Sequence, residues 1–165
     1  MNIKMVLAFL AVTTLLVSCS REEPVLAPVV VEPTVVKINE IYSRGTTTDP
    51  DWIEIYNASS VAVNITGYKI YDVGGQSGTK AKKEFPAGTI IPAKGYYVIV
   101  TDGTGTSDFG LSSAGEEVWL EDAAGKVIDD VTFLAMDVTQ TYARVPDGSA
   151  TWQLTSNMTR GASNK

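Results

Sequence analysis

The stretch Val61-Ala62-Val63-Asn64-Ile65 places an apolar side chain at every second position. This is the two-residue period of a β-strand. Other short apolar runs lie before and after this stretch. They are rich in Val, Ile, Tyr and Trp, the residues that suit a half-buried pleated surface. We therefore expect strands within residues 35–42, 52–56, 61–65, 68–71, 96–101, 118–121 and 127–134, and weaker ones at 141–145 and 151–154.

Turn-forming residues separate these runs. Glycine, proline and aspartate recur between them because these residues adopt or stabilise tight backbone turns. The turns are Asp49-Pro50-Asp51, Gly74-Gly75, Pro86-Ala87-Gly88, Pro92-Ala93-Lys94-Gly95, Asp102-Gly103, Ala124-Gly125-Lys126 and Pro146-Asp147-Gly148. Many short strands at this spacing predict an all-β antiparallel sandwich or barrel that occupies residues 34–165 as one domain.

The composition limits the chemistry that the chain can perform. Its 165 residues include no histidine and a single cysteine, Cys19. A Ser-His-Asp or Cys-His nucleophilic site and an intrachain disulfide are therefore excluded, and the usual ligands of zinc, copper and iron are almost absent. We expect no cofactor. After residues 1–18, 12 basic side chains face 19 acidic ones, a net charge of −7. Such a surface repels phosphate backbones, so no nucleic-acid partner is expected.

The amino terminus has the pattern of an export signal. A cationic start with Lys4 precedes an apolar run from Met5 to Val17, which is short for a transmembrane helix. Leu16-Val17-Ser18-Cys19 resembles the lipobox of bacterial lipoproteins. That resemblance implies cleavage between Ser18 and Cys19 and lipidation of Cys19. The alternative is an ordinary signal peptide that leaves a free thiol.

Residues 19–33 are expected to form a lipidated tether between the membrane and the domain. Ser20-Arg21-Glu22-Glu23 resembles the short acidic signal that sends some bacterial lipoproteins to the outside of the outer membrane, and a solvated linker start is an equal alternative. Pro24, Pro28 and Pro33 favour an extended chain that would span roughly 40 Å. We expect an outer-membrane lipoprotein, and the sequence leaves open which membrane face carries the domain.

An ordered series of motifs in the remaining chain resembles the lamin tail domain. The series consists of Ile38-Asn39-Glu40-Ile41, Asp51-Trp52-Ile53-Glu54-Ile55-Tyr56-Asn57, Ile65-Thr66-Gly67-Tyr68, residues 85–96, residues 109–115, residues 117–129, Tyr142-Ala143-Arg144-Val145-Pro146-Asp147-Gly148 and Trp152. The resemblance implies an immunoglobulin-like β-sandwich. It implies no shared catalytic residues, because members of this family serve as contact surfaces.

Charged residues suggest two further sites. Glu40 and Glu54 could form a glycosidase-type carboxylate pair. We favour a structural role in which one of them pairs with Arg144. Asp49, Asp51 and Glu54, with Asp102 and Asp108 in another loop, could hold calcium, although turn formation is favoured because no calcium-loop motif is present.

Trp119 is the candidate for a ligand platform. It alternates with Val118 and Leu120, so one of the two sets should point away from the core. An exposed Trp119 beside tyrosines would bind a ligand, whereas the alternative is a cross-strand packing role.

We expect a non-catalytic, lipid-anchored module that contacts a protein or a glycan outside the cytoplasm. The alternatives are an accessory structural subunit of a cell-envelope complex and an exported hydrolase-associated domain. Hydrolysis would require a cleft with a carboxylate of raised pKa.

Overall fold

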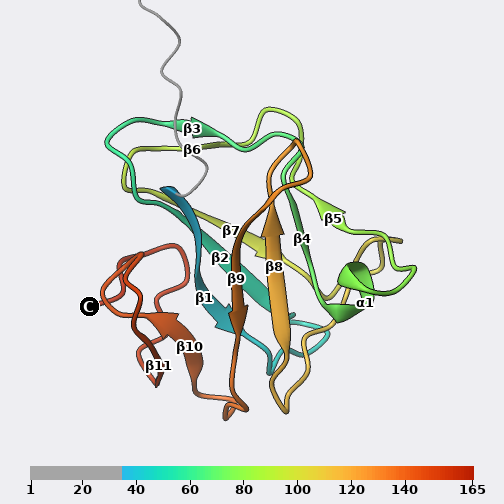
Figure 1. Cartoon of the computed structure of the whole chain (residues 1–165). Helices are drawn as coiled ribbons and strands as arrows, with labels where there is room; N and C mark the ends of the chain where they lie inside the picture. The colour runs from blue at the N-terminus through green and yellow to red at the C-terminus, as the bar shows by residue number, and fades with distance from the viewer. Residues whose placement is uncertain (1–34) are drawn as a thin grey trace, which may run out of the picture.

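The computed structural model describes residues 35–165, which form a sandwich of antiparallel sheets (Figure 1). The five-stranded sheet has the order β11-β10-β1-β2-β7 and contains β1 (Val36–Tyr42), β2 (Trp52–Asn57), β7 (Tyr96–Val100), β10 (Thr141–Arg144) and β11 (Trp152–Thr155). The four-stranded sheet has the order β5-β4-β8-β9 and contains β4 (Lys69–Tyr71), β5 (Lys83–Glu84), β8 (Glu117–Glu121) and β9 (Val127–Thr132). The expected all-β, immunoglobulin-like sandwich is confirmed.

Smaller elements complete the fold. β3 (Val63–Asn64) pairs with β6 (Ile90–Ile91), and α1 (Val73–Gln76) lies beside β4 (Figure 1). The strand expected over residues 61–65 is thus confined to two residues, and β5, β6 and α1 had no counterpart among the expected elements. Among residues 35–165, no helix has the length and hydrophobicity that crossing a bilayer requires. The expected signal peptide, lipobox and tether lie outside the described residues.

The core lies between the two larger sheets. Ile38, Ile53 and Ile55 of the five-stranded sheet and Val118 and Leu120 of the four-stranded sheet are fully buried in one apolar cluster. Alternation along each strand explains this placement, because side chains two residues apart face the same side of a sheet. Phe85, Phe109 and Phe133 fill the same cluster from the connecting segments.

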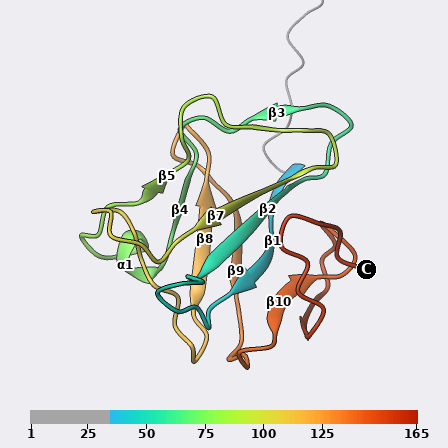
Figure 2. The ribbon, with the colours of Figure 1, turned by 180° about the vertical axis from the view of Figure 1, so that it is seen from behind.

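The carboxyl-terminal segment packs against part of the other face of the five-stranded sheet, beside β1 and β10 (Figure 2, red). All six residues of β2 are buried, although alternation would leave every second one exposed on a two-layer sandwich. The segment reaches this face through hydrogen bonds from Thr159 to Glu40 and from Gly161 to Glu54. Glu54 and Tyr56 are therefore buried on the side of the sheet opposite the main core.

Candidate binding surface

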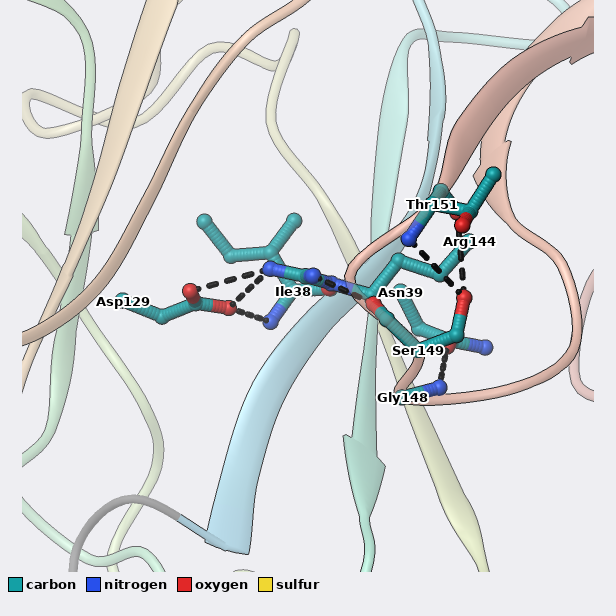
Figure 3. A network of polar contacts seen from close by, with 7 residues as sticks. All are labelled: Ile38, Asn39, Asp129, Arg144, Gly148, Ser149 and Thr151. Carbon is teal, nitrogen blue, oxygen red and sulfur yellow. Dashed lines mark hydrogen bonds and ion pairs between the residues drawn. The ribbon is translucent and has the colours of Figure 1, made fainter.

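Arg144 is the centre of a polar network at the edge of β1 (Figure 3). Its guanidinium pairs with Asp129 of β9, with Nη2 3.0 Å and 3.1 Å from the two carboxylate oxygens. The same guanidinium donates to the carbonyls of Ile38 and Ser149 at 2.8 Å and 2.6 Å. The expectation that Glu40 or Glu54 pairs with Arg144 is therefore wrong, because Asp129 occupies that position.

The Arg144–Asp129 pair substitutes for a missing strand along part of β1. β10 pairs with β1 at Glu40 and Ile41, so the backbone of Ile38 lies beyond that pairing. Arg144 donates to the Ile38 carbonyl, and Asp129 accepts from the Ile38 amide at 2.8 Å. The ion pair thus satisfies both backbone groups of a buried residue, which a β-ladder would otherwise do. This network joins β1, β9 and β10 and has a structural role.

Glu40 and Glu54 lie opposite each other in the register of β1 and β2, and both are fully buried. Glu40 accepts hydrogen bonds from Thr141 and Thr159, and Glu54 accepts from Asn39 and Gly161. Burial raises the pKa of Glu54 to about 7, against the hydrogen bonds from Asn39 and Gly161, and the charges of Glu40 and Asp147 raise it further. The two carboxylates face no open cleft, because the carboxyl-terminal segment lies over them.

Asp147 and Asn39 belong to the same cluster, and neither was among the predicted site residues. The Asn39 amide donates to Glu54 and to Asp147, both at 2.9 Å. Asp147 also accepts from Tyr96, Ser163 and the Asn164 amide. Asp147 lies in a Pro-Asp-Gly turn, where aspartate is common for purely local reasons. Only the fold brings that turn against β1.

The candidate calcium aspartates have other roles. Asp51 is buried, and its two oxygens accept from the backbone amides of Gly45 and Leu111 at 2.7 Å and 2.8 Å. Asp49 pairs with Arg160, and Asp108 pairs with Lys83. Within residues 35–165, no group of three acidic or thiol side chains has the geometry of a metal site.

Trp119 lies on the outer face of the four-stranded sheet. Val118 and Leu120 are fully buried on the core side, and Trp119 between them is partly exposed. Its ring stacks on Tyr71 of β4, its cross-strand neighbour, with centroids 6.1 Å apart and planes inclined by 14°. Trp119 therefore lies outside the core and beside a tyrosine, the arrangement that a ligand platform requires.

Tyr71 anchors this stack. It is buried, its hydroxyl donates to Glu121 at 3.2 Å, and the Lys82 ammonium lies 4.1 Å from the centre of its ring. Lys82 and Lys69 both pair with Glu121. Burial acts to raise the pKa of Glu121, but Lys82, Tyr71 and Lys69 outweigh it and hold the pKa below its ordinary value. The stack is thus fixed by a set of mutually satisfied groups, which orients the Trp119 ring.

Polar side chains surround Trp119. Asp130 is its cross-strand neighbour on β9 and is exposed, as is Thr132, and Glu117 is partly exposed. Neither Asp130 nor Glu117 has an ion-pair partner within the described part of the chain. Among the exposed large apolar side chains of residues 35–165, only Val127 belongs to a strand of the four-stranded sheet. We call Glu117, Trp119, Asp130 and Thr132 the Trp119 face.

A shallow hollow of about 250 Å³ lies elsewhere, between two loops. It is lined by Thr46, Thr47, Pro50, Asp102, Gly103 and Thr104. Its lining offers one carboxylate and no aromatic ring. The hollow therefore lacks the several convergent groups that mark a ligand pocket.

Comparison with known proteins agrees with this architecture. The family model described as Lamin Tail Domain matches residues 32–135, which is more than half of the chain. β10, β11 and the carboxyl-terminal segment lie beyond the matched residues. A search of curated proteins returns no match. The match agrees with the motifs up to residue 129 and with the sandwich fold, and the chain therefore belongs to the lamin tail domain family.

Proposed function

We propose that this protein is a lipid-anchored, non-catalytic module that binds a glycan through the Trp119 face on the extracytoplasmic side of a bacterial outer membrane. The lamin tail domain is an immunoglobulin-like module and typically not an enzyme, so binding is the function to be located on the fold. Cys19, outside the described residues, would supply the anchor.

The observation that carries this proposal is the placement of Trp119. Its aromatic ring is partly exposed on the outer face of the four-stranded sheet and is held by the buried Tyr71. A pre-oriented aromatic ring binds a ligand with little loss of conformational entropy. The apolar C–H face of a sugar ring stacks on such an aromatic surface, and its hydroxyl groups need nearby hydrogen-bond acceptors.

The surroundings of Trp119 favour a glycan over a protein partner. Protein hot spots are well-packed, desolvated pockets surrounded by contacts that exclude water. Asp130 and Thr132 instead place a carboxylate and a hydroxyl in solvent beside the ring. These groups hydrogen-bond to sugar hydroxyls directly or through water.

Binding to a panel of soluble neutral glycans, including chitin oligosaccharides, mannan and xylan, tests this proposal. Trp119→Ala should weaken binding about tenfold, because one aromatic stack contributes on the order of 1 kcal/mol beyond its buried area. Trp152→Ala is the matched control, since Trp152 is also partly exposed and stacks on a tyrosine, Tyr142, in the other sheet.

Two results would contradict the glycan proposal. One is the absence of binding to every glycan in the panel. The other is equal weakening by Trp119→Ala and Trp152→Ala. Crosslinking of a single envelope protein to the Trp119 face would instead indicate the accessory-subunit alternative.

The anchor is tested separately through Cys19. In a bacterial host, the protein should incorporate an alkyne-labelled fatty acid and fractionate with the outer membrane. Cys19→Ser should abolish both, because the acylated sulfur is lost. Incorporation of label by the Cys19→Ser variant would refute lipidation at this residue.

A further inference from the structure

Residues 156–165, here called the strap, lie against the outer face of the five-stranded sheet beside β1 and β10 (Figure 2). Of their side chains only Asn164 is buried, and both Met158 and Ala162 are exposed. Burial of apolar surface therefore contributes little to holding the strap. Its attachment depends on polar contacts with the sheet.

Most of these contacts end on three carboxylates. Thr159 donates to Glu40 through its amide at 3.1 Å and its hydroxyl at 2.9 Å. The Gly161 amide donates to Glu54 at 2.6 Å. Ser163 and the Asn164 amide donate to Asp147 at 2.7 Å and 3.0 Å. Every one of these donors is uncharged, so the strap brings no positive charge to the carboxylates.

The side chain of Asn164 completes the attachment at the end of the strap. It donates to the carbonyls of Asn39 and Arg144 at 3.3 Å and 3.0 Å. These bonds link the strap to the backbone of β1 and β10. They involve no titratable side chain, so their strength does not depend directly on pH.

The cations near the strap are directed elsewhere. The Arg160 guanidinium pairs with Asp49 and lies 5.4 Å from the centre of the Trp52 ring, and Arg144 pairs with Asp129. Within residues 35–165, no ion pair involves Glu40, Glu54 or Asp147.

Four titratable groups from the surrounding elements face Glu54 or Asp147. Glu40 of β1 and Asp147 in the loop after β10 face Glu54. Tyr96 of β7 donates to Asp147, and burial together with the nearby charge of Asp147 raises the pKa of Tyr56 of β2. None of them carries a positive charge. Three carboxylates thus share a covered site without a counter-ion.

We propose that the strap is a pH-controlled cover, closed while Glu54 is protonated and released when Glu54 ionises. Closure requires burying Glu54 next to Glu40, and it brings this site close to Asp147, to which Asn39 connects it. Buried like charges disfavour each other's ionised forms. Release exposes the carboxylates to water, which removes that cost. The proposal is independent of the glycan proposal, because the strap and the Trp119 face lie on different sheets.

The direction of the pH dependence follows from Glu54 and Asp147, the two carboxylates of this site whose pKa values are shifted. Burial raises the pKa of Glu54 to about 7 in the closed state, so closure is favoured below the ordinary pKa near 4.5 and weakens as pH rises through 7. For Asp147, burial acts upward, but the hydrogen bonds from Tyr96, Asn39, Ser163 and Asn164 outweigh it and lower the pKa. Asp147 therefore remains an ionised acceptor throughout this range. If release restores the ordinary pKa of Glu54, the ratio of closed to open strap falls by at most roughly 300-fold.

Amide NMR of the ¹⁵N-labelled protein between pH 5 and pH 9 tests the proposal. The amide signals of Thr159, Gly161 and Asn164 should move together toward unstructured positions with a midpoint near pH 7. The amide signals of Val118 and Leu120, in the core strand of the other sheet, should keep their positions. Glu54→Gln preserves the shape and one of the two acceptor oxygens and removes the charge, so it should keep the strap signals fixed over the whole range. Glu84→Gln, at an exposed glutamate on β5, should behave like the unmodified protein.

Three results would overturn the proposal. The strap signals could remain fixed to pH 9, Gly161 could titrate alone while Thr159 and Asn164 keep their positions, or the transition could persist in Glu54→Gln. If Glu54→Gln does not fold, carboxyl ¹³C NMR of the unmodified protein provides the second test. The Glu54 carboxyl should titrate with the same midpoint as the strap signals, and a Glu54 titration without any strap movement would refute the coupling.

Discussion

Replacing Arg144 by methionine tests the role of the polar network at the edge of β1. Methionine keeps much of the aliphatic volume and removes the guanidinium. The change leaves the Asp129 carboxylate without its cation and the carbonyls of Ile38 and Ser149 without their donor. It also removes the cation that lies 4.5 Å from the centre of the Trp152 ring.

The magnitude of the effect follows from burial. The Arg144 and Asp129 side chains are 7% and 12% exposed, so water cannot readily replace the lost partner. Removing one member of a buried ion pair costs about 3–5 kcal/mol because the other charge remains uncompensated. Burial raises the pKa of Asp129 despite the opposing charge of Arg144, so loss of Arg144 should raise it further. Arg144→Met should therefore lose about 3–5 kcal/mol of stability at pH 7.

Urea unfolding followed by tryptophan fluorescence measures this loss of stability. Arg160→Met is the matched control, because Arg160 also pairs with an aspartate and lies over a tryptophan but is 41% exposed with a partner that is 61% exposed. It should lose less than about 1 kcal/mol. Equal losses for Arg144→Met and Arg160→Met would refute the account of the network.

Three further predictions concern stability. Gly115→Ala should cost at least about 2 kcal/mol in urea unfolding, because Gly115 has φ +89° and a Cβ would lie 2.5 Å from the Phe133 carbonyl oxygen. The control Gly88→Ala, at φ +80° with open space around it, should cost about 1 kcal/mol, and equal costs for the two variants would contradict this explanation. Asp51→Ala should cost about 2 kcal/mol because it leaves the Gly45 and Leu111 amides without acceptors. Asp49→Ala, which removes the exposed ion pair with Arg160, should cost less than about 0.5 kcal/mol, and thermal unfolding would check this ranking. Between pH 5 and pH 8 the free energy of unfolding of the unmodified protein should fall by up to about 3 kcal/mol through Glu54, whose pKa is raised in the folded state. The free energy of unfolding of Glu54→Gln should fall by less over the same range, and parallel pH profiles for the two proteins would contradict this.

The sandwich and the alternation of Trp119 with Val118 and Leu120 followed from local sequence patterns, whereas the structure decides which of the two sets points outward. A strand has a two-residue period, so buried Val118 and Leu120 require Trp119 to face the other way. Turn residues marked the boundaries of the longer strands. The two-residue strands β5 and β6 could not be predicted this way, because two residues are too few to show a period.

The partner of Arg144 and the strap depend on contacts between distant residues. Asp129 lies in a run of mixed polarity in which Asp130 follows directly, and only the register of β9 decides which of the two faces Arg144. The strap consists mostly of small or polar residues and has no apolar period, so its sequence resembles an exposed tail. Its packing is visible only once Glu40, Glu54 and Asp147 are brought together by the fold.

The location of the binding surface is the central claim, and NMR mapping with a glycan from the panel tests it most directly. Added to the ¹⁵N-labelled protein, that glycan should shift the Trp119 indole signal and the amide signals of Glu117, Asp130 and Thr132 in β8 and β9. The amide signals of the strap and of the hollow lined by Thr46, Thr47 and Thr104 should remain unchanged. Shifts centred on the strap or on that hollow, with the Trp119 indole unmoved, would contradict the account.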